Sequence, residues 1–304
     1  NRLVPFDRVA GWGPPLDLVS GSPVTYTEPI TGELAVDLVV RGSHYTAGCG
    51  PSLFGEKIAS NRIISAAYYD LDRRSGVCSL NTFRSGCTAP MVPADGVYVA
   101  LNHNTCLCPH PIYTSMTMVH MPDADMWTYF PRMDFAPSLP IDSNPVDVWT
   151  NFPAGDPMRI EKPVLRVGIN FGAPGDRMAE NGTLWLDYPI VGGPSPALEV
   201  TMEPAKPKIF CYHQSRVKEG TGIPWVCSSG AKDLKSVTVK VNCDKSYKVR
   251  EYYSEPIGGN DLKLRSTVVE HSGVKAVDGK LKWDFTGKGY VCGLELVAEN
   301  MQGK

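Results

Sequence analysis

The stretch LNHNTCLCPHP, residues 101–111, brings together side chains that can bind metals or carry out redox chemistry. Thiolates and imidazoles are the usual ligands of zinc, and four thiolates can hold an iron–sulfur cluster. The C-x-C spacing is tighter than the spacing of structural zinc sites, and two cysteines this close are badly aimed to bridge each other. The candidate metal ligands are His103, Cys106, Cys108 and His110.

Disulfides are the simpler reading of this stretch. Crosslinks from Cys106 and Cys108 to Cys49 and Cys87 would satisfy all four thiols. We therefore expect no resident cofactor. The alternatives are a zinc site, a four-thiolate site formed by the same four cysteines, or a redox cofactor linked to a cysteine.

The number of cysteines indicates the cellular compartment in which the protein works. Nine cysteines in 304 residues are many for a reducing cytosol, so we expect a periplasmic, cell-surface or secreted protein. The odd count leaves at least one thiol over, and we assign it to Cys78, either buried or joining subunits. In the second half we expect Cys211 to pair with Cys227 and Cys243 with Cys292, although four cysteines allow other connectivities. The chain begins at Asn1 rather than Met, as expected of a processed protein or a piece of a longer one.

Charge and hydropathy exclude two classes of partner. Lys and Arg number 30 and Asp and Glu number 32, which leaves a net charge of -2. Without a basic run, the counterion release that drives nucleic-acid binding is missing. No window approaches the roughly 18 consecutive apolar residues that a membrane-spanning helix needs. We expect neither a nucleic-acid partner nor a membrane span.

The distribution of proline and glycine predicts an all-β protein. The 29 glycines and 26 prolines interrupt nearly every window that could form a helix, while short β-branched runs recur between turns. These runs predict strands within residues 63–71, 96–101, 114–121, 236–241 and 247–253. Residues 131–163 carry seven prolines, which excludes a central strand or helix. We predict two domains, residues 1–130 and 164–304, joined by a proline-rich linker that lies along a surface.

Two segments of the first domain share one pattern. TYTEPITGELAVDLVV (residues 25–40) and AAYYDLDRRSGVCSL (residues 66–80) each predict a strand, an acidic turn closed by glycine, and another strand. ITGEL and YYDLDRRSG resemble propeller blades of the pyrroloquinoline-quinone-like repeat family. RSGCTAPMVPADGVYVALNHNTCLCPHPIYTSMTMVHMP resembles the closing segment of large planctomycete propeller proteins of this type, so that the resemblance covers residues 25–130.

The second domain resembles the part that follows in those proteins. VGINFGAPGDRMAENGTLWLDYPIVGGPSP (residues 167–196) matches it, and YKVREYYSEP with TVVEHSGVKAVDGKLKWDFTGKGYVCGLELV is similar to the last strands of a malectin-like carbohydrate-binding domain. The resemblance implies incomplete propeller-like blades followed by a malectin-like (galactose-binding-like) β-sandwich. A full propeller needs about four to eight blades, and the chain has material for about two, so a central quinone site cannot be assembled from it alone.

A carbohydrate surface is one function that this resemblance suggests. Flat aromatic rings offer sugars a large contact area at little entropic cost. The loop GAPGDRMAENGTLW (residues 172–185) could be a ligand loop or an Ω-loop folded against Trp185. The candidate sugar-binding residues are Trp185, Tyr188, Trp225, Tyr252 and Tyr253.

No nucleophile elbow, zinc-protease helix or phosphate loop occurs in the sequence. Propeller blades without their neighbours leave exposed strand edges, which proteins cover or pair. We therefore expect a non-catalytic interaction or structural protein, a subunit of a larger assembly or cell-surface structure, whose β-edges pair with a protein partner or a second copy. The alternatives are a carbohydrate-binding module and a redox or quinone-linked accessory component.

Overall fold

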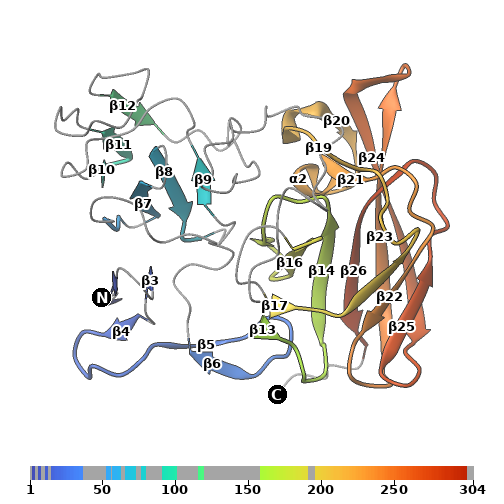
Figure 1. Ribbon diagram of the computed structural model, residues 1–304, viewed down its shortest axis with the longest axis horizontal. Helices are drawn as coiled ribbons and strands as arrows, with labels where there is room; N and C mark the ends of the chain where they lie inside the picture. The colour runs from blue at the N-terminus through green and yellow to red at the C-terminus, as the bar shows by residue number, and fades with distance from the viewer. Residues whose placement is uncertain are drawn as a thin grey trace. The chain divides into compact units, whose positions relative to one another are not determined.

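The computed structural model describes residues 2–3, 6–7, 11–12, 15–36, 53–55, 57–62, 66–72, 77–79, 91–100, 116–119, 158–190 and 196–299. Within these residues the protein is all-β, as predicted (Figure 1). The helical residues are one turn of α-helix, α2 (Pro224–Cys227), and one 3-10 turn, η2 (Gln214–Arg216). The chain forms two compact units: Asn1–Tyr26 with Leu34–Ser138, and Thr27–Glu33 with Leu139–Lys304. No helix of the described residues is long and apolar enough to cross a membrane.

The first part of the chain forms small antiparallel sheets. Their orders are β1-β4, β2-β3, β5-β6, β7-β8-β9 and β10-β11-β12. The strands are β1 (Arg2–Leu3), β2 (Phe6–Asp7), β3 (Gly11–Trp12), β4 (Leu16–Asp17), β5 (Thr25–Thr27), β6 (Leu34–Val36), β7 (Ile58–Arg62), β8 (Ala66–Asp70), β9 (Val77–Ser79), β10 (Met91–Ala94), β11 (Val97–Ala100) and β12 (Met116–Val119). The strands of both predicted strand–turn–strand segments are present, as β5–β6 and β8–β9, while residues 73–76 of the second turn lie outside the described residues.

The turn between β5 and β6 shows why the acidic residue and the glycine are needed. The Glu28 carboxylate accepts hydrogen bonds from the backbone N–H groups of Ile30 and Thr31 at 2.9 and 2.8 Å. Gly32 closes the turn with a positive φ of 75°, which glycine adopts without strain. Its N–H donates to the carbonyl of Glu28 at 2.7 Å.

This turn belongs to the second unit, and the sequence did not predict this assignment. The carbonyl of Ile30 accepts hydrogen bonds from the N–H groups of Leu165 and Arg166 at 2.6 and 3.1 Å. The Ile30 side chain is fully buried. Residues 27–33 are therefore part of the fold of the second unit, although the sequence places them in the first domain.

The second unit is built on a curled nine-stranded sheet. Its main path runs β15-β16-β14-β26-β23-β24-β20, and β19 and β21 join it through β26 (Figure 1). The strands are β14 (Arg166–Phe171), β15 (Arg177–Met178), β16 (Leu184–Tyr188), β19 (Ile209–Cys211), β20 (Val217–Gly220), β21 (Ser229–Ala231), β23 (Ser246–Ile257), β24 (Asn260–Lys275) and β26 (Tyr290–Ala298). The predicted strands within residues 236–241 and 247–253 are present as parts of β22 and β23.

A three-stranded sheet covers one face of the large sheet. It has the order β18-β22-β25 and consists of β18 (Val200–Glu203), β22 (Ser236–Lys240) and β25 (Lys280–Asp284), while β13 (Met158–Arg159) pairs with β17 (Pro196–Ala197). The Tyr188 hydroxyl donates to the carbonyl of Val200 at 2.7 Å, and the rings of His271 and Trp283 lie 4.8 Å apart. These contacts join the two sheets, so the second unit is a β-sandwich.

The opposite face of the large sheet is covered by α2 and by the loop before β16. Gly168 and Gly293 lie on this face beneath the indole ring of Trp185. The Val226 side chain of α2 also approaches Gly293. This second, smaller core contains four residues that the sequence marks as functional: Trp185, Cys227, Tyr252 and Cys292.

Candidate functional site

The five predicted sugar-binding aromatic residues do not form one exposed platform. Trp185 is fully buried, and Tyr252 and Tyr253 are 5% and 1% exposed. Only Tyr188 and Trp225 are half-buried. The alternation of side chains along a strand places aromatic residues on a face but does not say whether another segment covers that face.

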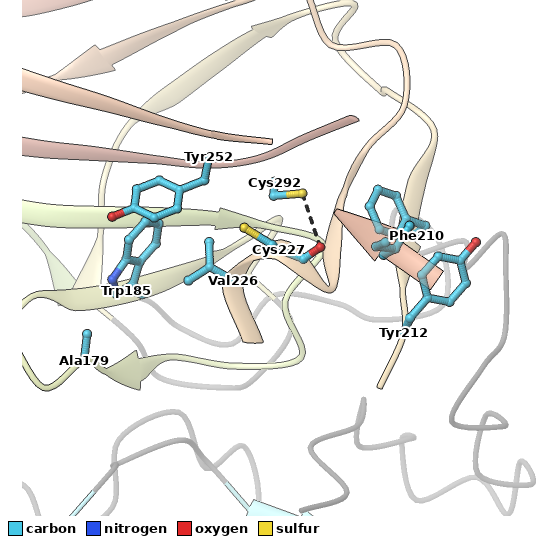
Figure 2. Packing of buried hydrophobic residues seen from close by; sticks show 9 residues of the cluster. Ala179, Trp185, Phe210, Tyr212, Val226, Cys227, Tyr252 and Cys292 are labelled. Carbon is cyan, nitrogen blue, oxygen red and sulfur yellow. Dashed lines mark hydrogen bonds between the residues drawn. The ribbon is translucent and has the colours of Figure 1, made fainter. Parts of the chain in front are cut away.

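The five residues also point to different sides of the sheet. Trp185 packs edge-to-face against Tyr252 in the core drawn in Figure 2, with ring centroids 4.9 Å apart. It also packs edge-to-face against Trp225, at 6.1 Å. Tyr253 packs against Phe285 at 6.4 Å, on the side of the three-stranded sheet. These rings stabilise two cores and leave the carbohydrate hypothesis without its predicted surface.

The loop before β16 is folded inward onto the sheet. One Asp176 carboxylate oxygen accepts the backbone N–H of Asp187 at 3.2 Å, and Arg177 lies 4.8 Å above the ring of Trp225. Asn181 donates its amide N–H to Glu295 at 3.2 Å, whereas Glu180 is exposed. The Ω-loop alternative therefore describes these contacts better than an open ligand loop does.

The buried carboxylate of Glu295 is the centre of a polar network on the same face. Its Oε1 accepts from Thr183 Oγ1 at 2.5 Å, in addition to Asn181. Its Oε2 accepts from Arg250 Nη1 at 3.0 Å and from the Tyr252 hydroxyl at 3.1 Å. With four donors around one carboxylate, Glu295 is a structural anion and has little capacity left for a substrate.

This network continues outward across β23 and β24. Arg250 Nε donates to Glu270 at 2.7 Å, and Lys248 Nζ lies 3.1 Å from the same carboxylate. Burial lowers the pKa of Arg250, but its hydrogen bonds to Glu270 and Glu295 outweigh burial and raise that pKa. The row of alternating charges runs from the buried Glu295 to the exposed Glu270.

A second buried carboxylate, Glu251, lies on the opposite face. It accepts from the Tyr253 hydroxyl, from both the N–H and the hydroxyl of Thr286 at 3.0 and 2.8 Å, and contacts His271 Nε2 at 2.7 Å. Burial raises the pKa of this carboxyl, but the hydrogen bonds from Tyr253 and Thr286 outweigh burial and lower the pKa below its ordinary value. Glu251 is thus held as an anion between the two sheets.

A third cluster gathers around Asp261 at the start of β24. The Asp261 carboxylate accepts from the Tyr212 hydroxyl at 2.8 Å, from Lys232 Nζ at 2.9 Å and from the Tyr290 hydroxyl at 3.3 Å. Burial raises the pKa of Asp261, but the hydrogen bonds from Lys232 and Tyr212 outweigh it and lower that pKa. Lys232 also lies 4.8 Å from the centroid of the Tyr290 ring. The Lys232 and Asp261 side chains are only 26% and 28% exposed.

The sequence did not predict these three networks as units. Their members come from segments far apart in the chain. Within β23, only the spacings of Arg250 with Tyr252 and of Glu251 with Tyr253, two residues apart, indicate a shared face. Glu295 and Asp261 carry no such local signal.

Cys227, Cys243 and Cys292 are free thiols, so neither of the predicted pairs, Cys211–Cys227 and Cys243–Cys292, is formed. Cys243 contacts the Tyr247 hydroxyl at 3.1 Å, and Cys292 donates to the Ser254 hydroxyl at 3.2 Å. Cys292 Sγ also lies 3.6 Å from the backbone carbonyl oxygen of Cys227.

Of the other cysteines and histidines that the sequence marks, Cys78 is the one that falls on the described residues. Cys78 belongs to β9. Among the described residues, no group of three or more His, Cys, Asp or Glu side chains is arranged to hold a metal ion. Outside the described residues lie Cys49, Cys87, His103, Cys106, Cys108 and His110.

One stretch of the large sheet presents an open edge. β24 pairs with β23 along its length, but on its other side β20 contacts only Leu264, Arg265 and Ser266. Beyond Ser266, no strand of the described residues pairs with this side of β24. Gly273, with a φ of 73°, lies where the pairing with β23 shifts register. The open edge therefore runs from Thr267 to His271.

No family model matches the sequence, and no curated protein matches it. Among solved structures, three of β-glucuronidase from Bacteroides uniformis are similar over 44% of this chain and 18% of theirs, with a TM-score of 0.29. One of these structures has a covalently bound cyclophellitol-6-carboxylate aziridine and another is a calcium-binding mutant. Sequence identity is 9–10%, and the chain spans less than a fifth of the length of these enzymes.

Proposed function

We propose that the protein is a non-catalytic interaction module that works as a subunit of a larger secreted assembly. The observation that carries this proposal is the open edge of β24 between Thr267 and His271. An open edge offers a row of backbone donors and acceptors to a strand of another chain. In this proposal the second unit is a malectin-like sandwich, as its resemblance in sequence implies.

The chemistry of the buried carboxylates also favours an interaction role. Glu295 and Glu251 are fully buried, and both are surrounded by donors from several strands. General acid–base catalysis needs a carboxylate within reach of the proton that it transfers. Carboxylates enclosed in this way hold strands together and do not face a substrate.

A second copy of the chain is the simplest occupant of the open edge. Two β24 strands paired antiparallel about Val269 would place Glu270 of one copy opposite Val268 of the other. No like charges would then face each other, and such like-charged pairs are what destabilise cross-strand contacts. A symmetric dimer formed in this way uses the β24 edge of both copies, so this contact closes on itself and does not propagate to further copies.

Two proline variants test this arrangement. In a strand, the N–H groups of adjacent residues point to opposite sides. One of the variants Val268→Pro and Val269→Pro therefore removes an N–H that is directed at β23, and the other removes an N–H on the open side. Both valines are half-buried, which makes the variants a matched pair. The variant that loses the inner hydrogen bond should show the larger fall in melting temperature.

Analytical ultracentrifugation over a range of protein concentrations measures the oligomeric state. The wild type should dimerise, and the proline variant that keeps its melting temperature should remain monomeric. Pairing through this edge would be contradicted if the wild type stayed monomeric at every concentration. It would also be contradicted if both proline variants folded well and dimerised equally.

A further inference from the structure

Cys227 and Cys292 lie in the second core and are both fully buried (Figure 2). Cys227 is the last residue of α2, and Cys292 lies in β26. Cys292 Sγ is 3.6 Å from the backbone carbonyl oxygen of Cys227, and both side chains belong to one buried cluster.

A β-bulge explains why Cys292 faces α2. The adjacent residues Tyr252 and Tyr253 of β23 pair with Gly293 and Val291 of β26, so Cys292 is the extra residue between them. A bulge changes the direction of the side chain at the extra position. Cys292 thereby lies in the same buried cluster as Cys227 and Tyr252.

The short helix fixes the other thiol. Pro224 occupies the first turn of α2, and the N–H groups of Val226 and Cys227 donate to the carbonyl of Ile223 at 3.0 and 2.9 Å. A Cβ atom at Gly222 would lie 2.5 Å from Cys227 Sγ, so the thiol fills the space beneath this glycine. The two sulfur atoms are therefore held near each other by different segments of the chain.

We propose that Cys227 and Cys292 are an oxidation site, at which a low-molecular-weight disulfide converts the two thiols into a disulfide that ties α2 to β26. One thiolate attacks the disulfide R–S–S–R, forming a mixed disulfide and releasing one RSH. The second thiolate then attacks the sulfur of its partner cysteine and releases a second RSH. The protein loses two protons and two electrons, and the reagent is reduced to two thiols.

Access and ionisation determine how fast this reaction proceeds. The hydrogen bond with Cys292 and burial raise the pKa of the Cys227 thiol well above its ordinary value. The thiolate is the attacking species, so the reaction should be slow on the folded protein and faster at higher pH. Opening of α2 must also precede attack, because both thiols are buried.

The effect of the bond on stability follows from the length of the loop that it closes. The two cysteines are separated by 65 positions in the chain. A crosslink of that length restricts the unfolded chain, and we expect the melting temperature to rise by about 5–10 °C.

Refolding in glutathione buffers tests the proposal without depending on access to the folded core. The protein is unfolded, refolded at a series of ratios of oxidised to reduced glutathione, alkylated, digested and analysed for linked peptides by mass spectrometry. We expect a peptide pair that joins Cys227 to Cys292, with a rise in melting temperature that parallels its appearance. Linkage of Cys227 to Cys211, or free Cys227 and Cys292 in the most oxidising buffer, would overturn the proposal.

Variants separate this pair from the other thiols. Cys227→Ser and Cys292→Ser should each abolish the linked peptide and the rise in melting temperature. Cys243→Ser is the matched control, because Cys243 contacts Tyr247 and lies outside the buried cluster. It should retain both effects. If a serine variant does not fold, the comparison of oxidised and reduced wild type still decides the result.

Discussion

The indole ring of Trp185 lies directly on the backbone of Gly168, its partner in the neighbouring strand. A Cβ atom at position 168 would come within 2.1 Å of Trp185 Cδ2. The two residues are paired in the register of β14 and β16, and Gly293 of β26 makes room for the other side of the same ring. The absence of side chains on two adjacent strands thus creates the space that the tryptophan fills.

Gly168→Ala should destabilise the second unit by about 3 kcal/mol, because the added methyl group has no space in a tightly packed core. The measurement is the free energy of unfolding in urea. The double variant Gly168→Ala/Trp185→Leu should lose less stability than the sum of the two single variants, since the collision is removed. Strict additivity would mean that the two residues are not in contact.

The contact between Glu295 and Arg250 leads to a second prediction. Glu295→Gln replaces a carboxylate oxygen by an NH₂ group that must face one of the four surrounding donors, and it leaves Arg250 without its buried partner. We expect a loss of about 3 kcal/mol in the free energy of unfolding. Glu270→Gln changes the same kind of group at the exposed end of the network, where the side chain is 43% exposed. It should cost less than about 1 kcal/mol, and equal losses for the two variants would contradict the difference in burial.

The sequence predicted the class of fold and many of its strands, but it did not predict which surfaces are covered. Turns marked by glycine and proline and runs of β-branched residues are local signals, and they correctly predicted the strands β8, β11, β22 and β23. The burial of Trp185 and Tyr252 depends on α2, a single turn that has no periodic pattern. The contact between Cys227 and Cys292 depends on a bulge whose position requires the pairing of two strands. Such relationships between distant segments are not encoded in a local pattern.

The turn that carries Ile30 gives a third prediction, because the sequence placed it in the other domain. Its side chain is fully buried in the second unit, and its carbonyl accepts two hydrogen bonds from Leu165 and Arg166. Ile30→Ala should destabilise the second unit by about 3 kcal/mol. Leu34→Ala, four residues later and 75% exposed, should change the stability by less than about 0.5 kcal/mol.

Amide hydrogen exchange at Leu165 and Arg166 is the more specific readout for Ile30→Ala. Exchange of both amides should accelerate when the turn is loosened, and it should remain at the wild-type rate in Leu34→Ala. Unchanged protection in Ile30→Ala would show that the turn is not part of the second unit.

Glu251 links stability to pH. Its pKa in the folded protein is lowered from the ordinary value of 4.5, so in this range the unfolded chain binds more protons than the folded one. The stabilisation is therefore complete above about pH 5 and is lost as the pH falls through the lowered pKa of the folded state. Glu251→Gln should lower the free energy of unfolding at pH 7 by about 2–4 kcal/mol and should flatten its decline towards acid pH.

Thr286→Ala gives an independent check on the same carboxylate. It removes the hydroxyl donor to Glu251 Oε1 but leaves the charge and the backbone N–H donor in place. The pKa of Glu251 in the folded state should rise towards its ordinary value, so the acid decline should be shallower than in the wild type and steeper than in Glu251→Gln. Urea unfolding curves measured from neutral to acid pH give all three slopes. A wild-type slope in Glu251→Gln would assign the acid sensitivity to other carboxylates, among which Asp261 also has a lowered pKa.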